Sequence, residues 1–276
     1  MKKIFLLAIT LVLVFSTLFT SCNSCKNRGV DKDQKKIKIE DPGAITDEIE
    51  KHVYPLPTSA EVIKMLTELE VGYIIGISNP VDNATNYITS KSQAINLGIY
   101  GTDLSYATLY NMNQDVINFL DVIRELTNSL KMSKIYSREL YDDIKNSFDN
   151  RDKLVEILTN AFNKTYAYLA ENDQESLALL VVAGAWVEGM YITTHISEQV
   201  YHVEGIVRVL LEQKESFELY LELAEPFTDD PVVGEMLDIL EPVKKVYEEV
   251  EDNSLTMKNV EDITAAIELV RDKLVS

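Results

Sequence analysis

The sequence predicts an all-α fold, an antiparallel helical bundle or a short helical array of roughly eight to ten helices. No proline occurs between Val81 and Glu225, and apolar residues in this stretch recur mostly every three to four positions. That spacing places them on one face of a helix. Only Val71 to Ile77 has a strand-like composition. With 276 residues, 46% of them hydrophobic, the chain is able to bury a sizeable core.

The expected helices follow one another with short connections, which makes neighbouring helices antiparallel. The apolar stripe is clearest in residues 115–130 and 151–169. Helix-boundary signals stand at Asn79-Pro80, Ser137, Asn172-Asp173 and Asp230-Pro231. The expected ranges are 58–70, 82–97, 102–112, 113–131, 137–148, 150–171, 174–200, 203–225, 231–250 and 256–275.

Two glycines, Gly98 and Gly101, separate the second and third expected helices. Glycine commonly ends a helix, and Thr102 or Asp103 is suited to cap the next one. The stretch has no preceding strand and no following lysine, so it does not match a phosphate-binding loop. We therefore expect a break between two helices here.

The N-terminus has the layout of a secretory signal. Lys2 and Lys3 precede a nearly unbroken apolar run from Ile4 to Phe19. The stretch Leu18-Phe19-Thr20-Ser21-Cys22 resembles the lipobox of bacterial lipoproteins, with Phe19 where that motif prefers Leu. The resemblance implies that residues 1–21 are a signal peptide and that Cys22 is acylated and becomes the mature N-terminus. Cys25 is the weaker alternative, because it has no apolar run of its own.

Residues 22–57 are expected to form a flexible tether that leads into one helical domain, residues 58–276. The first 40 residues hold eight Lys/Arg and three Asp/Glu, whereas residues 41–276 hold 18 and 42. A basic tether suits an anionic membrane surface. The acidic domain makes nucleic acid an unsuitable partner, because phosphates require basic patches. Residues 212–276 alone hold 18 Asp/Glu and six Lys/Arg, and we expect them to form a solvated acidic surface.

Four residues suggest a divalent metal site on the helix around residues 185–202. Glu188, His195, Glu198 and His202 fall on one face if the helix continues through them. Carboxylate and imidazole together suit Zn²⁺, Mn²⁺ or iron. The set lacks the spacing of the known zinc-protease and di-iron motifs. A polar stripe between helices, with Glu198 and His202 as an i,i+4 pair, explains it equally.

A second set of residues suggests ligand binding. Glu188 interrupts the most hydrophobic segment of the domain beside Trp186, so its carboxylate needs a partner or a raised pKa. A buried ion pair meets that need as well as a ligand does. Tyr100, Tyr106 and Tyr110 are spaced either to line one groove or to pack at the edge of the core. The candidate ligand-binding residues are Asp103, Tyr106, Trp186 and Glu188.

Motifs for catalysis are missing from the sequence. Both cysteines lie at the signal junction, which excludes a cysteine nucleophile or a thiolate metal site in the domain. The sequence contains no nucleophile elbow, no zinc-protease motif and no nucleotide-binding loop. It therefore favours a non-enzymatic interaction module that binds an envelope protein, and no cofactor is expected. The alternative is a metal- or small-ligand-binding protein that uses the Glu/His face.

The domain, particularly residues 98–107 and 185–191, resembles a family of uncharacterised all-helical lipoproteins of Bacteroidetes type. This resemblance implies an origin and an envelope location but brings no activity. Lipoproteins of this type are usually held at the outer membrane. Those exported to the cell surface tend to carry acidic residues just after the cysteine, whereas Asn23-Ser24-Cys25-Lys26 follows Cys22 here. We therefore expect a periplasm-facing, outer-membrane lipoprotein.

Overall fold

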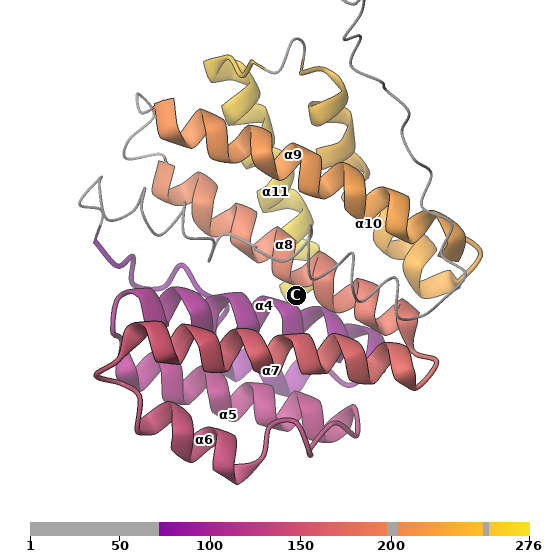
Figure 1. Ribbon diagram of the computed structural model, residues 1–276. Helices are drawn as coiled ribbons and strands as arrows, with labels where there is room; N and C mark the ends of the chain where they lie inside the picture. Colours follow the sequence, from indigo (N-terminus) through magenta and orange to yellow (C-terminus); the bar gives the residue numbers. More distant parts are fainter. Residues whose placement is uncertain (1–71, 198–203, 251–253) are drawn as a thin grey trace, which may run out of the picture. The chain divides into compact units, whose positions relative to one another are not determined.

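The computed structural model describes residues 72–197, 204–250 and 254–276. All described residues belong to one compact unit. The predicted signal peptide, the tether and the expected helix 58–70 lie outside the described residues. The described residues form helices and no strand, which confirms the predicted all-α class. These helices (Figure 1) are η2 (Val81–Asn86), α4 (Ser90–Leu109), α5 (Asn113–Ser129), α6 (Arg138–Lys145), α7 (Arg151–Glu171), α8 (Glu175–Ser197), α9 (Glu204–Ala224), η3 (Glu225–Phe227), α10 (Pro231–Glu248) and α11 (Met257–Val275).

Several helix boundaries lie where the sequence predicts them. Ser137 caps α6 by accepting a hydrogen bond from the Leu140 backbone N–H. Asp230 caps α10 by accepting from the Val232 N–H, and Pro231 follows it at the first helical position. Between α7 and α8, Asp173 takes a left-handed conformation with φ of 55°, which ends one helix before the next begins. Local cap chemistry therefore sets these ends.

The expected break at Gly98 and Gly101 is wrong, because α4 runs without interruption from Ser90 to Leu109. The two glycines serve packing instead. A Cβ on Gly98 would lie 2.0 Å from the Val181 carbonyl oxygen on α8, and one on Gly101 would lie 1.9 Å from the Phe162 ring on α7. Thr102 caps nothing; its hydroxyl donates to the Ala185 carbonyl oxygen across the helix pair at 3.1 Å.

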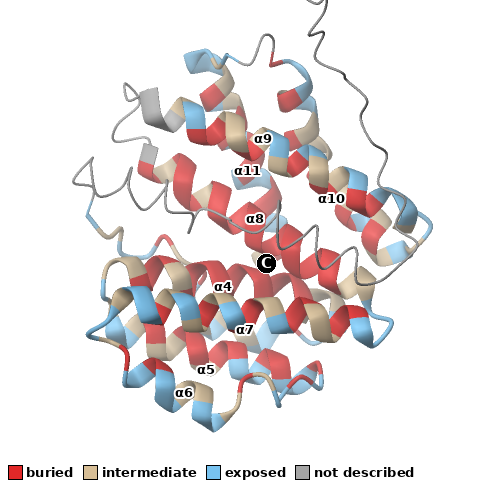
Figure 2. Cartoon of the chain, in the orientation of Figure 1, coloured by how far each residue is buried: buried red, intermediate tan, exposed pale blue. Residues whose placement is uncertain are grey.

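The helix pair α4 and α8 forms the centre of the domain. Their contact is the most extensive between any two described helices, and both are coloured almost entirely as buried in Figure 2. Gly184 of α8 lies against Ile95 of α4, where an added Cβ would be 2.1 Å from the carbonyl oxygen. Gly98 of α4 and Gly184 of α8 therefore both lie where the two helices cross. In Figure 1, α4, α5, α6 and α7 lie on one side of α8, while α9, α10 and α11 lie on the other.

Helix α8 is also the one described helix that is long and apolar enough to cross a membrane. The span is Glu175–Ile196, and 89% of its most apolar window is buried inside the protein. Packing against α4, α7, α10 and α11 accounts for the apolar composition.

Replacing Gly98 with Ala should destabilise the domain by about 3 kcal/mol, because the methyl group has no space against the α8 backbone. The free energy of unfolding, measured by urea titration of the full chain, checks this. The control is Gly234→Ala in α10, where the new Cβ would lie 3.2 Å from the Thr228 carbonyl oxygen. Because alanine has a higher helix propensity than glycine, Gly234→Ala should change the free energy of unfolding by no more than about 1 kcal/mol. Equal losses from the two substitutions would contradict close helix packing at Gly98.

Candidate functional site

A buried ion pair joins α8 to α11. Arg271 donates from Nε to Glu188 Oε2 at 2.6 Å and from a terminal nitrogen to Glu188 Oε1 at 2.8 Å. A further hydrogen bond runs from the guanidinium to the Ile77 carbonyl oxygen at 3.2 Å. The Glu188 side chain is fully buried and that of Arg271 is 9% exposed. Both carboxylate oxygens of Glu188 thus have a charged donor, which gives this residue the partner that its apolar helix requires.

Asp103 of α4 is the third ionisable group of this cluster. Its carboxylate Oδ2 accepts the Asn79 backbone N–H at 3.1 Å, and the side chain is fully buried. Burial and the neighbouring Glu188 carboxylate raise the pKa of Asp103 well above its usual value, although Arg271 and the Asn79 N–H act in the opposite direction. A neutral Asp103 leaves one negative and one positive charge in the buried cluster, so the charges balance.

Hydrogen bonds extend from this cluster to the end of the C-terminal helix. Asn79 donates to the Tyr87 hydroxyl at 3.0 Å and to Asn96 Oδ1 at 3.3 Å. Tyr87 in turn donates to the Val275 carbonyl oxygen, and Asn96 donates to the Leu274 carbonyl oxygen. The last turn of α11 thereby obtains donors for carbonyls that no intrahelical N–H reaches. The polar network fixes α11 and the segment around Asn79 against α4.

Three side chains stack one on another beside the ion pair, in the order Arg271, Tyr191 and His195. The Arg271 guanidinium carbon lies 3.9 Å from the centroid of the Tyr191 ring, and the His195 ring centroid lies 3.9 Å from the same ring. His195 Nε2 lies 3.1 Å from Glu268 Oε1, and its Nδ1 lies 2.8 Å from the Tyr191 carbonyl oxygen. Each ring nitrogen of His195 therefore has a partner within the protein.

The four candidate ligand-binding residues are all buried, and the structure separates them into three places. Asp103 and Glu188 share the ionic cluster. Tyr106 packs with Tyr73 at 5.0 Å between ring centroids and also with Tyr110 at 5.2 Å. Burial raises the pKa of Tyr106 to about 12. Trp186 stacks on Phe217 of α9, with 4.7 Å between centroids.

Of the two interpretations of these tyrosines, the groove is wrong for Tyr100, which packs in the core instead of lining a groove with Tyr106 and Tyr110. Tyr100 is fully buried, packs on Phe119 and donates its hydroxyl to the Pro80 carbonyl oxygen at 2.8 Å. The reason is that α4 is one helix buried along most of its length, so its tyrosines lie inside the core rather than along an open surface.

The metal hypothesis stays a prediction. Glu198 and His202 lie outside the described residues, as does the acylated Cys22 of the anchor hypothesis. Within the described ranges, no group of three or more His, Cys, Asp or Glu is arranged to hold a metal ion. Glu188 is engaged by Arg271 and His195 by Glu268, so a metal would have to displace these partners.

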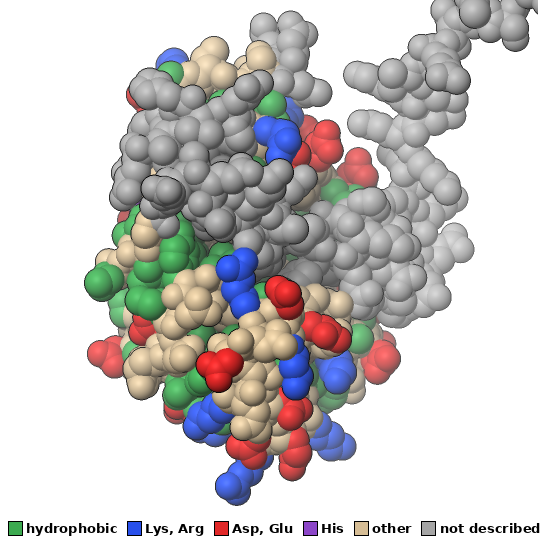
Figure 3. Space-filling model, turned by 60° about the vertical axis from the view of Figure 1, so that its left-hand side comes forward, with side chains coloured by type: hydrophobic (Ala, Val, Ile, Leu, Met, Phe, Trp, Pro, Cys, Tyr) green, Lys and Arg blue, Asp and Glu red, His purple; other side chains and the backbone are tan. Residues whose placement is uncertain are grey.

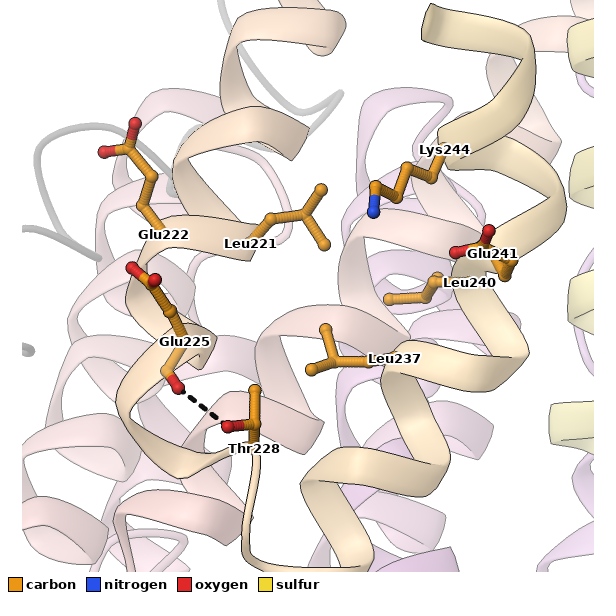
Figure 4. A pocket seen from close by; sticks show the side chains of 8 residues that line it. All are labelled: Leu221, Glu222, Glu225, Thr228, Leu237, Leu240, Glu241 and Lys244. Carbon is orange, nitrogen blue, oxygen red and sulfur yellow. Dashed lines mark hydrogen bonds between the residues drawn. The ribbon is translucent and has the colours of Figure 1, made fainter. Parts of the chain in front are cut away.

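An open groove of about 340 Å³ lies between α9 with η3 and α10. Its floor is made of leucines, and acidic side chains and one lysine stand around it, as Figure 4 shows. The volume falls at the lower end of the range for binding sites in proteins. The lining residues are Leu221, Glu222, Glu225, Thr228, Leu237, Leu240, Glu241 and Lys244.

Neither Arg271 nor the groove was predicted from the sequence. Arg271 stands in the apolar stripe of α11, between Ile267 and Leu274, and a lone charge in a stripe is the same signal that marked Glu188. Two lone charges of opposite sign on two apolar stripes can indicate a buried pair. The sequence holds no comparable signal for the groove, because the groove depends on the relative positions of α9 and α10 in the fold.

Breaking the buried ion pair should lower the free energy of unfolding far more than breaking an exposed ion pair does. Arg271→Met leaves Glu188 without its donors and should lower the free energy of unfolding by about 3–5 kcal/mol. The control, Arg124→Met, removes the exposed pair with Asp121 and should cost no more than about 1 kcal/mol. Urea unfolding of the full-length variants provides both values, and similar losses would contradict the structural role of the buried pair.

Asp103 should make stability depend on pH. Because its pKa is raised in the folded state, its contribution is complete below the ordinary aspartate pKa of 3.8 and declines as the pH rises above that value. Asp103→Asn keeps an oxygen to accept the Asn79 N–H but cannot ionise. Between about pH 4 and about pH 8, the variant should gain stability relative to the wild type. A constant difference over this range would contradict the raised pKa.

Comparison of the chain with models of known protein families, with curated proteins and with solved structures gives no match.

Proposed function

We propose that this protein is a lipid-anchored component of the bacterial cell envelope whose helical body is a non-enzymatic binding module. The binding role rests on one observation, the open groove between α9, η3 and α10. The groove combines an apolar floor with charged side chains at its edge (Figure 4), which is the usual composition of a recognition site. The partner is an envelope protein.

The buried ionic cluster supports this proposal because it serves the fold. Glu188, Asp103 and Arg271 are surrounded by protein, and their hydrogen bonds go to Asn79, Ile77 and one another. Such a network fixes the position of α11 relative to α8, and α10 packs on both of these helices. The cluster thereby helps to hold the α10 side of the groove.

The anchoring part of the proposal rests on the sequence. The lipobox-like stretch ends at Cys22, and a predominantly basic segment separates it from the acidic domain. Acyl chains on the cysteine hold a protein at a membrane, since each buried methylene contributes about 0.8 kcal/mol. The tether, residues 22–57, then allows the domain to reach partners near the membrane, at the outer membrane and facing the periplasm in this proposal.

Cys22→Ala should abolish incorporation of labelled palmitate when the full chain is produced in bacteria, because the acceptor thiol is lost. Cys25→Ala is the matched control and should keep the label. Gel fluorography of the purified variants gives the result. Label retained in Cys22→Ala and lost in Cys25→Ala would move the anchor to the second cysteine, and label retained in both would reject it.

A photoreactive amino acid at Thr228, an exposed residue of the groove, should yield a discrete crosslinked product in intact cells. The same amino acid at Asp143, an exposed residue of α6, is the positional control and should not yield that product. Adding Leu237→Gln to the Thr228 variant should reduce the product about tenfold, because Leu237 forms part of the floor. Binding at the groove would be contradicted if the product formed equally from both positions. It would also be contradicted if Leu237→Gln left the yield of the product unchanged.

A further inference from the structure

The floor of the groove is suited to an apolar side chain. Leu240 is buried, while Leu221 and Leu237 are only partly buried and lie along the opening (Figure 4). Leu221 projects from α9, and the other two project from α10. An apolar side chain placed between them would remove leucine surface from water on both sides, which is favourable in proportion to the area covered.

The α9 side of the groove has negative charge that no described residue neutralises. Glu222 and Glu225 are exposed, and no Lys or Arg of the described ranges lies within ion-pair distance of either carboxylate. These two carboxylates are therefore accessible to a cation from outside.

On the α10 side of the groove, two lysines each form an ion pair with a glutamate of the same helix. Lys244 Nζ lies 3.9 Å from Glu248 Oε1, and Lys245 Nζ lies 3.7 Å from Glu241 Oε1. Both pairs have i,i+4 spacing, which stabilises helices modestly. Neither lysine is within ion-pair distance of Glu222 or Glu225 across the groove, so the groove keeps an excess of negative charge.

The negative charge is concentrated in this part of the chain rather than spread evenly. Residues 212–276 hold 18 Asp/Glu and six Lys/Arg, whereas residues 113–171 hold ten and eight. Figure 3 shows Lys/Arg and Asp/Glu side chains interspersed over the lower part of the molecule, where Figure 1 places α5, α6 and α7. A cationic partner would therefore be steered towards α9, α10 and α11 rather than towards α5–α7.

We infer that the groove binds a segment of a partner protein that inserts an apolar side chain and carries Lys or Arg beside it. This inference rests on the proposed function and adds the chemistry of the partner. The apolar side chain packs on Leu221, Leu237 and Leu240, and the neighbouring cation lies near Glu222 and Glu225. The leucines supply most of the affinity. The exposed glutamates mainly supply specificity and a faster association, because surface ion pairs contribute little to affinity.

The test uses short fluorescent peptides and the full-length protein, purified from membranes in a neutral detergent. One peptide combines leucine with lysine, a second combines leucine with glutamate, and a third combines serine with lysine. Fluorescence anisotropy at low ionic strength gives the dissociation constants. The leucine–lysine peptide should bind at least about tenfold more tightly than either of the others.

Substitutions in the groove test whether the peptide binds there. Leu237→Gln should weaken the leucine–lysine peptide about tenfold, and its control is Leu269→Gln, which changes an exposed leucine of α11. Glu222→Gln with Glu225→Gln should weaken it about fivefold and reduce the salt dependence. The control for charge is Glu215→Gln with Asp238→Asn, which removes the same charge from exposed positions of α9 and α10 outside the groove. Circular dichroism should show the same helicity in all variants.

The outcomes separate this inference from the proposed function. Equal weakening by the groove variants and their controls would show general attraction to an acidic surface, and the inference would be wrong. If the peptides do not discriminate but the Thr228 crosslink persists and depends on Leu237, the binding role stands and the basic partner is wrong. If the peptides do not discriminate and the Thr228 crosslink does not form, the binding role and the partner chemistry are both wrong.

Discussion

The contact between the backbones of α4 and α8 is the constraint on which the rest of the domain depends. Gly98 and Gly184 lie where the two helices cross, and at each position a single methyl group would collide with a carbonyl oxygen of the other helix. The close approach buries both helices along most of their length (Figure 2). Helices α5 and α7 then pack on α4, while α10 and α11 pack on α8.

Burial of the two central helices explains the polar chemistry at their contact. Asp103 on α4 and Glu188 on α8 are both fully buried, so their charges need neutralisation or protonation. Arg271 supplies a bidentate partner to Glu188, and Asp103 favours the neutral form. The result is a charge-balanced centre that also orients α11. The same groups would suit an acid–base site if solvent reached them, but here they are surrounded by the core.

The domain has a different character at its acidic end. There α9 and α10 leave an open, leucine-lined groove whose glutamates on one side have no cation within the described part of the chain. Glu188 and Arg271 in the interior pair with each other, whereas the glutamates on the α9 side of the groove have no cation within the described residues, and the proposed binding role uses this difference. In the proposed arrangement, the lipid anchor restricts this surface to the membrane neighbourhood, which raises the effective concentration of partners held at the same membrane.

The sequence by itself determined the helical class, most helix ends and one residue that would need a partner, because periodicity, caps and a lone charge in an apolar stripe are local signals. It placed Glu188 correctly as a residue in need of neutralisation. Only the tertiary structure decided that Arg271, 83 residues later, provides the partner, that Gly98 serves packing and that α9 and α10 leave a groove. Each of these depends on which helices meet and at what distance, and the local pattern around a residue does not establish which distant residue it contacts.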